Sequence, residues 1–229
     1  MAVHPPMIDL LIFDFDGLIL DTETPEYEAW QEIYAEFGVR LSLDAWADCI
    51  GQRAGVFDPI AHLESLIGAT VPRAELRERH RLRFHRLVHD EALRPGIVSY
   101  LDDADRLGIQ LAVASSATRD WVVGHLMRHA IDHRFACIVT VEDVTHAKPD
   151  PELFNLALAR LNVPADRAVV IEDSPNGLLA ANRAGIFAVA VPNPVTAGLH
   201  LGHADLTIAS LAQCPVPELI ETISKIRTP

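Results

Sequence analysis

The sequence predicts an α/β protein, namely a doubly wound parallel sheet that carries one helical insert. Five short apolar runs rich in branched residues are typical of strands buried on both faces. They are Ile8–Phe15, Gln110–Ala114, Cys137–Val141, Ala168–Ile171 and Phe187–Val191. The segments between the later runs have the apolar spacing and cap residues of helices. Because strand and helix alternate from about residue 95 onward, we expect parallel strands.

The segment from Asp21 to about Leu93 has no strand-like run, and its apolar spacing is helical throughout. Its first helix places four aromatic residues on one face, where we expect the insert's own core: Tyr27, Trp30, Tyr34 and Phe37. The arginine-rich stretch Arg73–His89 is expected to be a solvated helix face, because acidic residues dilute its charge. We therefore predict an α/β core domain from residues 1–20 and 95–229, and a helical domain from residues 21–94.

Composition excludes several classes of protein. The 229 residues carry a net charge of −13 and only two lysines, which argues against a surface for nucleic acid polymers or anionic membranes. The three cysteines lie far apart, which is unlike a disulfide framework or a structural zinc site and favours the cytoplasm. No stretch approaches the roughly 20 apolar residues of a membrane span. We expect a cytoplasmic protein, and a monomer.

Polar residues follow the predicted strands at the edge of the sheet where ligands bind. Asp14 and Asp16 come after the first strand, and their spacing puts both carboxylates on the same side. They repel each other unless a cation or a proton lies between them. Ser115 and Ser116 lie between a strand and a helix, where backbone N–H groups favour an anion.

Two further motifs complete this edge. Lys148 directly precedes a predicted helix, with Asp150 as its N-cap and Pro151 as its first residue. Glu172 and Asp173 follow the fourth strand. Each motif alone is a weak signal. Together, four acids, a lysine and a serine at one edge predict a pocket for a divalent cation and a phosphoryl group.

These motifs resemble, in order and spacing, the four motifs of the haloacid dehalogenase superfamily. They are Asp14-Phe-Asp-Gly-Leu-Ile-Leu-Asp-Thr-Glu23, Ser115, Lys148-Pro-Asp-Pro and Ile171-Glu-Asp-Ser-Pro-Asn-Gly177. The helical insert resembles the C1 cap of the β-phosphoglucomutase-like branch. The resemblance implies that Asp14 is a nucleophile that forms an aspartyl-phosphate, and that Asp16 is first the acid and then the base. It also implies that Ser115 binds the phosphoryl group and that Lys148 offsets its charge.

The same resemblance implies Mg²⁺ as the cofactor. The ion would be held by the Asp14 carboxylate, the backbone carbonyl of Asp16 and Asp173, with Glu172 binding directly or through water. The substrate would be a small phosphomonoester.

Four residues are candidates for substrate binding: Ser116, Gln52, Arg53 and Glu26. Arg53 either grips a polar or anionic part of the leaving group or is an ordinary surface arginine.

Departures from the family pattern help to choose among its chemistries. Metal-free dehalogenases do not need Asp16, and phosphonoacetaldehyde hydrolases need a cap lysine that residues 21–93 lack. Mutases carry a cap histidine ten residues after the second aspartate, where this chain has Glu26. We therefore predict a phosphatase for a sugar phosphate, phosphoglycolate or nucleoside monophosphate. A hexose-phosphate mutase, a phospho-acceptor switch resembling receiver domains, and an idle binding scaffold are the alternatives.

Overall fold

The computed structural model describes residues 8–50 and 57–227, and it contains a six-stranded parallel sheet in the order β3-β2-β1-β4-β5-β6. The strands are β1 Leu10–Phe13, β2 Gln110–Ala114, β3 Cys137–Val139, β4 Ala168–Glu172, β5 Phe187–Ala190 and β6 Leu206–Thr207. The predicted doubly wound parallel sheet is confirmed. Sequence analysis missed β6, because its two residues are too few to form an apolar run.

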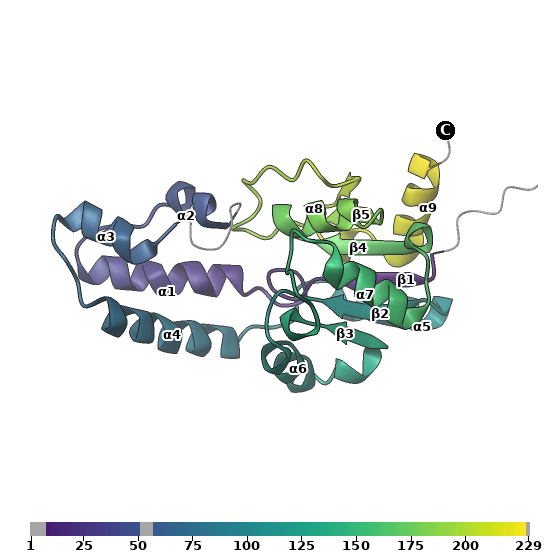
Figure 1. The fold of residues 1–229 in the computed structure, drawn as a ribbon, viewed down its shortest axis with the longest axis horizontal. Helices are drawn as coiled ribbons and strands as arrows, with labels where there is room; N and C mark the ends of the chain where they lie inside the picture. The colour runs from purple at the N-terminus through teal and green to yellow at the C-terminus, as the bar shows by residue number, and fades with distance from the viewer. Residues whose placement is uncertain (1–7, 51–56, 228–229) are drawn as a thin grey trace, which may run out of the picture.

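Helices cover both faces of the sheet and form a separate layer beyond its end (Figure 1). Those around the sheet are α5 Ile97–Leu107, α6 Arg119–Arg128, α7 Glu152–Leu161, α8 Pro175–Arg183 and α9 Val216–Arg227. Those of the helical insert are α1 Glu23–Glu36, α2 Leu43–Ile50, α3 Pro59–Ile67 and α4 Arg73–His89. Short 3₁₀ turns span Asp132–Arg134, Val141–Asp143, Ala165–Arg167 and Leu211–Gln213.

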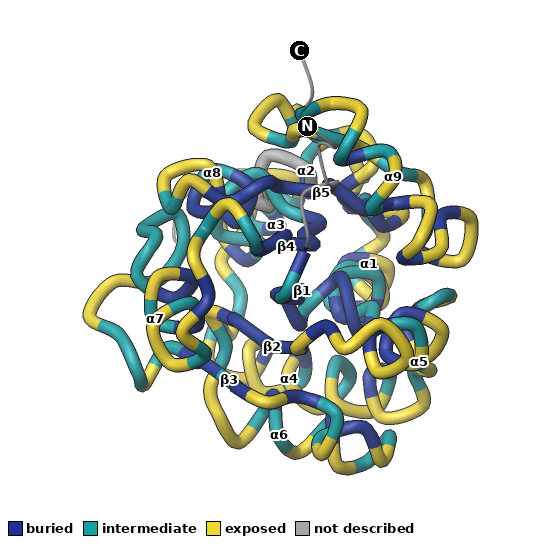
Figure 2. The backbone as a smooth tube through the Cα atoms, turned by 90° about the vertical axis from the view of Figure 1, so that its right-hand side faces the viewer, coloured by how far each residue is buried: buried dark blue, intermediate teal, exposed yellow. Residues whose placement is uncertain are grey.

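Alternation along β1 explains the two apolar layers of the core. Leu11 and Phe13 face one layer, to which α5, α6 and α9 contribute, whereas Leu10 and Ile12 face the other, with α7 and α8. Figure 2 shows the resulting buried strands at the centre of the molecule. Since β1 pairs in register with both β2 and β4, the carboxyl ends of these three strands lie at one edge.

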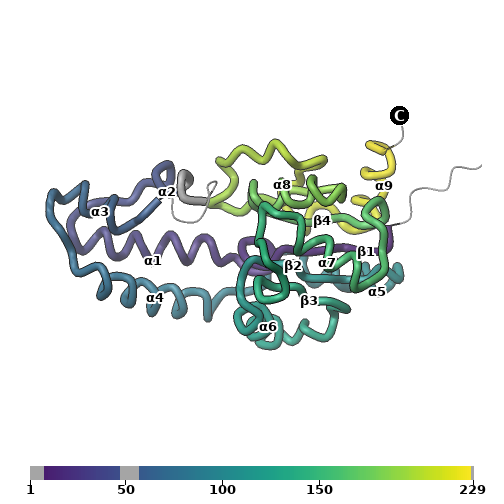
Figure 3. Tube along the Cα trace, in the orientation of Figure 1, coloured from purple at the N-terminus to yellow at the C-terminus, as the bar shows by residue number. Residues whose placement is uncertain are grey.

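The helical insert has its own apolar cluster. Trp30 and Tyr34 are buried in it, and Tyr27 and Phe37 pack against it, as the aromatic spacing predicts. The chain leaves the sheet after β1, passes through four helices and returns at α5 (Figure 3). Val195, from the segment after β5, also joins this cluster, so the core contacts the insert. The division into two domains stays a prediction.

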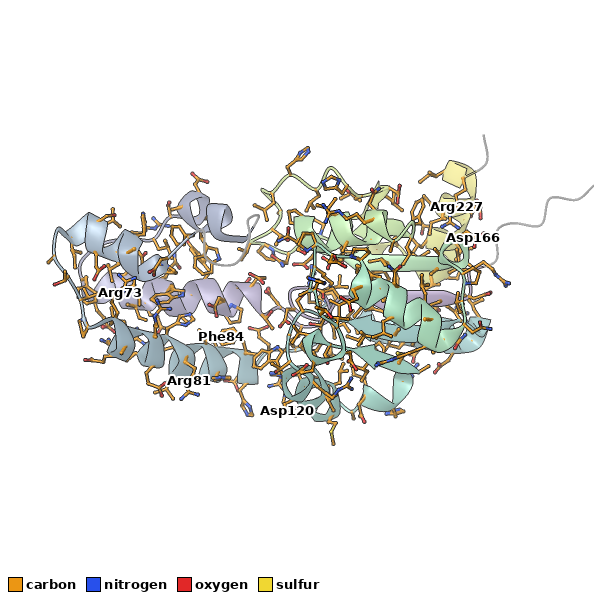
Figure 4. The ribbon with its side chains drawn as sticks, viewed as in Figure 1. Arg73, Arg81, Phe84, Asp120, Asp166 and Arg227 are labelled. Atoms are coloured by element: carbon orange, nitrogen blue, oxygen red, sulfur yellow. The ribbon has the colours of Figure 1, made fainter. Side chains whose placement is uncertain are left out.

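Helix α4 corrects the prediction that Arg73–His89 is simply a solvated face. Arg83 Nε lies 3.5 Å from Glu32 Oε2, and Arg79 and Arg83 both contact Glu36. The acidic partners of these arginines lie on α1 rather than only on α4 itself. Because such exposed pairs contribute only about 0–1 kcal/mol each, their main effect is to set how α4 lies along α1. Arg81 does point away from α1 (Figure 4).

The two segments that join the insert to the sheet lie side by side. Leu20 and Leu93 form an antiparallel bridge, and the backbone N–H of Arg94 donates to the carbonyl of Ile19 at 3.0 Å. Among the residues that the structure describes, no helix is long and apolar enough to cross a membrane.

Candidate active site

A cavity of about 540 Å³ opens where the carboxyl edge of the sheet meets the helical insert. It is lined by Asp14, Asp16, Glu23, Glu26, Trp46, Ser115, Ser116, Ala117, Ala147, Lys148, Glu172, Asp173, Ser174 and Asn176. The structure thus brings together every predicted site residue except Gln52 and Arg53, which lie outside the described residues.

Lys148 links two acids at the bottom of this cavity. Its Nζ donates to Asp14 Oδ1 at 2.6 Å and to Glu172 Oε1 at 2.8 Å, and only 6% of its side chain is exposed. Burial alone would lower the pKa of Lys148, but the two carboxylates more than offset this and raise it above its ordinary value. Lys148 therefore carries a fixed positive charge beside Asp14.

The start of α7 differs from the prediction by one residue. Asp150 N–H donates to the Ala147 carbonyl at 3.1 Å, which closes a turn, and Pro151 is the N-cap rather than the first helical residue. Asp150 Oδ1 still accepts from the N–H of Glu152 at 3.0 Å. Asp150, the expected N-cap, belongs instead to the turn that contains Lys148, so the helix begins at Glu152.

Glu172 is fully buried, and both of its carboxylate oxygens are occupied. Oε1 accepts from Lys148, and Oε2 accepts from the N–H groups of Asp173 and Ser174 at 2.9 and 2.8 Å. The Ser174 hydroxyl donates to the same Oε2 and accepts from Gly177 N–H, which caps α8. These contacts make Glu172 an anchor for Lys148 and for the start of α8.

The two carboxylate oxygens of Asp173 differ, because only one of them accepts a hydrogen bond from a described residue. Oδ2 accepts from Asn193 Nδ2 at 2.7 Å, whereas Oδ1 is buried and has no hydrogen-bond partner among the described residues. Gly17, with a φ of +77°, packs so closely that an added Cβ would overlap Oδ2. Sequence analysis missed Asn193, although the Pro192-Asn193-Pro194 segment directly after a strand is a signal that could have found it.

The charges at this edge do not balance. Ligand atoms of Asp14, Glu172 and Asp173 all lie within 4.8 Å of one another, facing the single ammonium of Lys148. Burial raises the pKa of Asp14 to about 7, with Glu172 adding to the effect and Lys148 opposing it. Burial, Glu172 and Asp14 together raise the pKa of Asp173 well above its usual range. A divalent cation would remove this excess of negative charge, and carboxylate oxygens are the ligands that Mg²⁺ prefers.

Asp16 is only partly buried and contacts α6. Its Oδ1 accepts from Trp121 Nε1 at 2.8 Å, and burial raises its pKa, while Trp121 opposes that shift. Ser115 is buried, and its hydroxyl accepts from the N–H of Ala117 at 3.0 Å. Ser116 is exposed at the rim. No sequence signal pointed to Trp121.

The insert contributes acids to the opposite side of the cavity. Burial and Asp16 raise the pKa of Glu23 to about 8, and burial raises the pKa of Glu26 to about 7. His80 Nε2 lies 3.4 Å from Glu26 Oε1, but burial lowers the pKa of His80 to about 4. The His80 ring is therefore neutral at pH 7, and this contact is not an ion pair. Sequence analysis missed Glu23 and His80 as residues of this region.

The first prediction concerns Gly177, whose added Cβ would overlap the Glu172 carboxylate. Gly177→Ala is expected to displace Glu172, lower any turnover at this site at least tenfold and lower the free energy of unfolding by about 1–3 kcal/mol, as overpacking does. Gly124→Ala is the matched control, because Gly124 is an exposed helical residue with open space around it. It should raise stability by up to about 1 kcal/mol. Equal behaviour of the two variants in urea unfolding and turnover would contradict this account of Gly177.

Comparison with known proteins agrees with this geometry. A family model described as haloacid dehalogenase-like hydrolase matches residues 11–191, so the chain belongs to that family. "Putative phosphatase YhcW" of Bacillus subtilis (strain 168) is 43% identical over 218 residues, which cover 95% of this chain and 99% of that protein. The "Phosphorylated carbohydrates phosphatase" of Thermotoga maritima is 28% identical over 96% of this chain and 100% of its own length.

A solved structure shows the branch of the family. The β-phosphoglucomutase from Clostridium difficile superposes with a TM-score of 0.71 at 25% identity, covering 96% of this chain and 98% of the other. The chain is thus a haloacid dehalogenase-like phosphomonoester hydrolase of the β-phosphoglucomutase-like branch.

Proposed function

We propose that this protein is a Mg²⁺-dependent phosphatase that hydrolyses a small phosphorylated carbohydrate through an aspartyl-phosphate on Asp14. One observation carries the proposal: a buried carboxylate, Asp14, is held by Lys148 Nζ at 2.6 Å within reach of a second acid, Asp173, that has an unpartnered oxygen. This arrangement suits a nucleophile that must approach an anionic phosphoryl group.

In the first step, an Asp14 oxygen attacks phosphorus, and the bond from phosphorus to the leaving oxygen breaks. Lys148 offsets the negative charge of Asp14 and of the phosphoryl oxygens, so that the two anions can meet. Ser115, which follows β2, donates to a phosphoryl oxygen. Asp14, Asp173 and the backbone carbonyl of Asp16 would hold Mg²⁺, which supplies further charge neutralisation when bound.

Asp16 moves the protons of both steps. In the first, it gives its proton to the leaving oxygen, which departs as an alcohol. In the second, it takes a proton from a water that attacks phosphorus, and the bond between phosphorus and Asp14 breaks to release phosphate. The raised pKa of Asp16 favours the protonated form that the first step requires.

The insert side of the cavity favours a leaving group with hydroxyl groups. Glu23 and Glu26 offer carboxyl oxygens that accept hydrogen bonds. Trp46 Nε1 is buried and has no partner in the part of the chain that is described, so it can donate to a substrate oxygen. Above the raised pKa values of about 8 for Glu23 and about 7 for Glu26, both glutamates are ionised and would repel a carboxylate on the substrate, which disfavours phosphoglycolate. The Thermotoga maritima relative, named a phosphorylated carbohydrates phosphatase, supports the same substrate class.

The experiment that tests this proposal measures phosphate release, with Mg²⁺, from neutral sugar and polyol phosphates and from 2-phosphoglycolate. We expect kcat/KM for the best neutral carbohydrate phosphate to exceed that for 2-phosphoglycolate at least tenfold. The comparison is made near pH 9, above the pKa of about 8 to which burial and Asp16 raise Glu23, and there Glu23→Gln should narrow the gap in kcat/KM by removing the charge. A preference for 2-phosphoglycolate would contradict the assigned class, and a lack of Mg²⁺-dependent release from any phosphomonoester would contradict the phosphatase.

Glu26 distinguishes hydrolysis from the mutase alternative, because it occupies the position of the mutase histidine and lines the cavity. Incubation with β-glucose 1-phosphate is expected to yield phosphate and glucose without glucose 6-phosphate. A coupled assay with glucose 6-phosphate dehydrogenase detects the 6-phosphate at low concentration. Its accumulation faster than phosphate release would make the protein a mutase.

A further inference from the structure

Trp121 contacts the proposed acid from outside the family motifs. It lies in the first turn of α6, and its Nε1 donates to Asp16 Oδ1 at 2.8 Å across a sequence separation of 105 residues. The proposed chemistry assigns no task to Trp121. Its contact with Asp16 is nevertheless a direct one, to the carboxylate that moves the protons.

Aromatic rings on two sides hold the indole of Trp121. Phe84 of α4 stacks on it, with ring centroids 5.6 Å apart and an interplanar angle of 21°. His125, one turn further along α6, contacts it edge to face with centroids 4.2 Å apart. Figure 4 labels Phe84 on α4 and Asp120, the neighbour of Trp121, on α6. The insert and the core therefore both fix the plane of this ring.

The Phe84 ring is itself the end of a stack within the insert. It lies 6.2 Å from the His80 ring at an interplanar angle of 10°, and His80 lies 4.3 Å from Trp30 at 15°. Burial keeps His80 neutral, so the stack adds no charge beside Asp16. Any shift of α4 against the core would move Phe84 across the face of Trp121.

An indole has one N–H, which lies in the ring plane, so the orientation of the ring decides where the hydrogen bond points. The bond occupies Oδ1 of Asp16, so Oδ2 would have to carry the proton that Asp16 gives and takes. We propose that Trp121 is a positioning residue that aims the Asp16 carboxyl at the leaving oxygen, and that Phe84 keeps Trp121 in this orientation. This inference rests on the proposed function, since it assumes that Asp16 is the acid.

The test is Trp121→Phe, which keeps a stacking ring and removes the N–H. Rapid quench measures formation of the phosphoenzyme from a sugar phosphate and from p-nitrophenyl phosphate. A misplaced acid should slow the step at least tenfold for the alkyl leaving group, with KM changed less than about threefold. The p-nitrophenyl step should slow less than about threefold, because nitrophenolate leaves without a proton. A ring that only packs would give equal losses or none, and either result overturns the proposal.

A second variant keeps the proposal testable if Trp121→Phe does not fold. Phe84→Leu leaves the N–H in place and removes the stacked ring. We expect it also to slow phosphoenzyme formation more for the alkyl leaving group than for p-nitrophenyl phosphate, but by a smaller factor than Trp121→Phe. Phe37→Leu, a partly buried phenylalanine in the insert's own cluster, is the matched control and should not discriminate between the two leaving groups. Equal effects of Phe84→Leu and Phe37→Leu would also overturn the proposal.

Failure of this inference differs from failure of the proposed function. If the unaltered protein releases no phosphate from either substrate, the proposed function is wrong. If the unaltered protein does release phosphate and Trp121→Phe behaves in the same way, the phosphatase assignment stands and only the positioning role of Trp121 is wrong.

Discussion

Asp14→Asn is expected to reduce turnover by a factor on the order of 10³ or more, because it removes the attacking oxygen anion. The change keeps the size of the side chain, so the buried contacts around β1 should survive. The phosphoenzyme should disappear together with turnover. Steady-state phosphate release and acid-quenched, hydroxylamine-sensitive labelling from a ³²P-substrate measure the two effects on the same preparations.

Asp166→Asn is the matched control for this experiment. Asp166 is an exposed aspartate just before β4, at the opposite edge of the sheet from the cavity (Figure 4). Its replacement should change neither turnover nor labelling. If Asp14→Asn kept a tenth of the activity and a full label, another residue would be the nucleophile.

Removal of divalent cations is expected to have an effect of similar size. When ionised, Asp14, Glu172 and Asp173 would carry two more negative charges than Lys148 compensates, and this excess would hinder the approach of an anionic substrate. Excess EDTA should therefore abolish phosphate release, and Mg²⁺ should restore it. Ca²⁺ should bind without restoring activity, since its longer and looser coordination displaces the nucleophile.

Cation binding can also be measured without turnover. At a Mg²⁺ concentration about 100 times Kd, binding stabilises the folded state by about 2.7 kcal/mol, which for a chain of this length raises Tm by roughly 5–10 °C. Asp173→Asn should lose this shift, because it replaces the carboxylate that has a free buried oxygen. Asp166→Asn should keep it. Full activity in EDTA, or an unchanged Mg²⁺ shift in Asp173→Asn, would falsify the proposed metal site.

Local chemistry explains why much of the sheet and several residues of the cavity could be predicted. A buried parallel strand is a continuous apolar run, and the residue that ends the run lies at the edge where ligands bind. Asp14, Ser115 and Glu172 are predicted in this way, from the strand ends alone. The two-residue strand β6 was not found, because so short a run has no period, and α7 begins one residue later than predicted, because a turn follows Lys148.

Contacts between distant segments could not be predicted. Trp121 reaches Asp16 only because α6 packs against the sheet, and Asn193 reaches Asp173 only because the segment after β5 folds back over Gly17. Trp121 comes from a segment with no local sign of chemistry, and the only local sign of Asn193 is its place between two prolines after a strand. His80 beside Glu26 is a similar case, since α1 and α4 are joined by more than 30 residues of chain but lie side by side.

The sequence by itself determined the class of fold, the edge of the sheet that carries the chemistry and the acids and lysine gathered there, because apolar periodicity and strand ends are local properties of the chain. Only the tertiary structure decided how those charges are shared. It left one oxygen of Asp173 free, occupied both oxygens of Glu172 and placed an indole N–H on Asp16. Hydrogen bonds of this kind depend on angstrom-scale distances between elements, which are set by the packing of helices on the sheet and not by the order of residues along the chain.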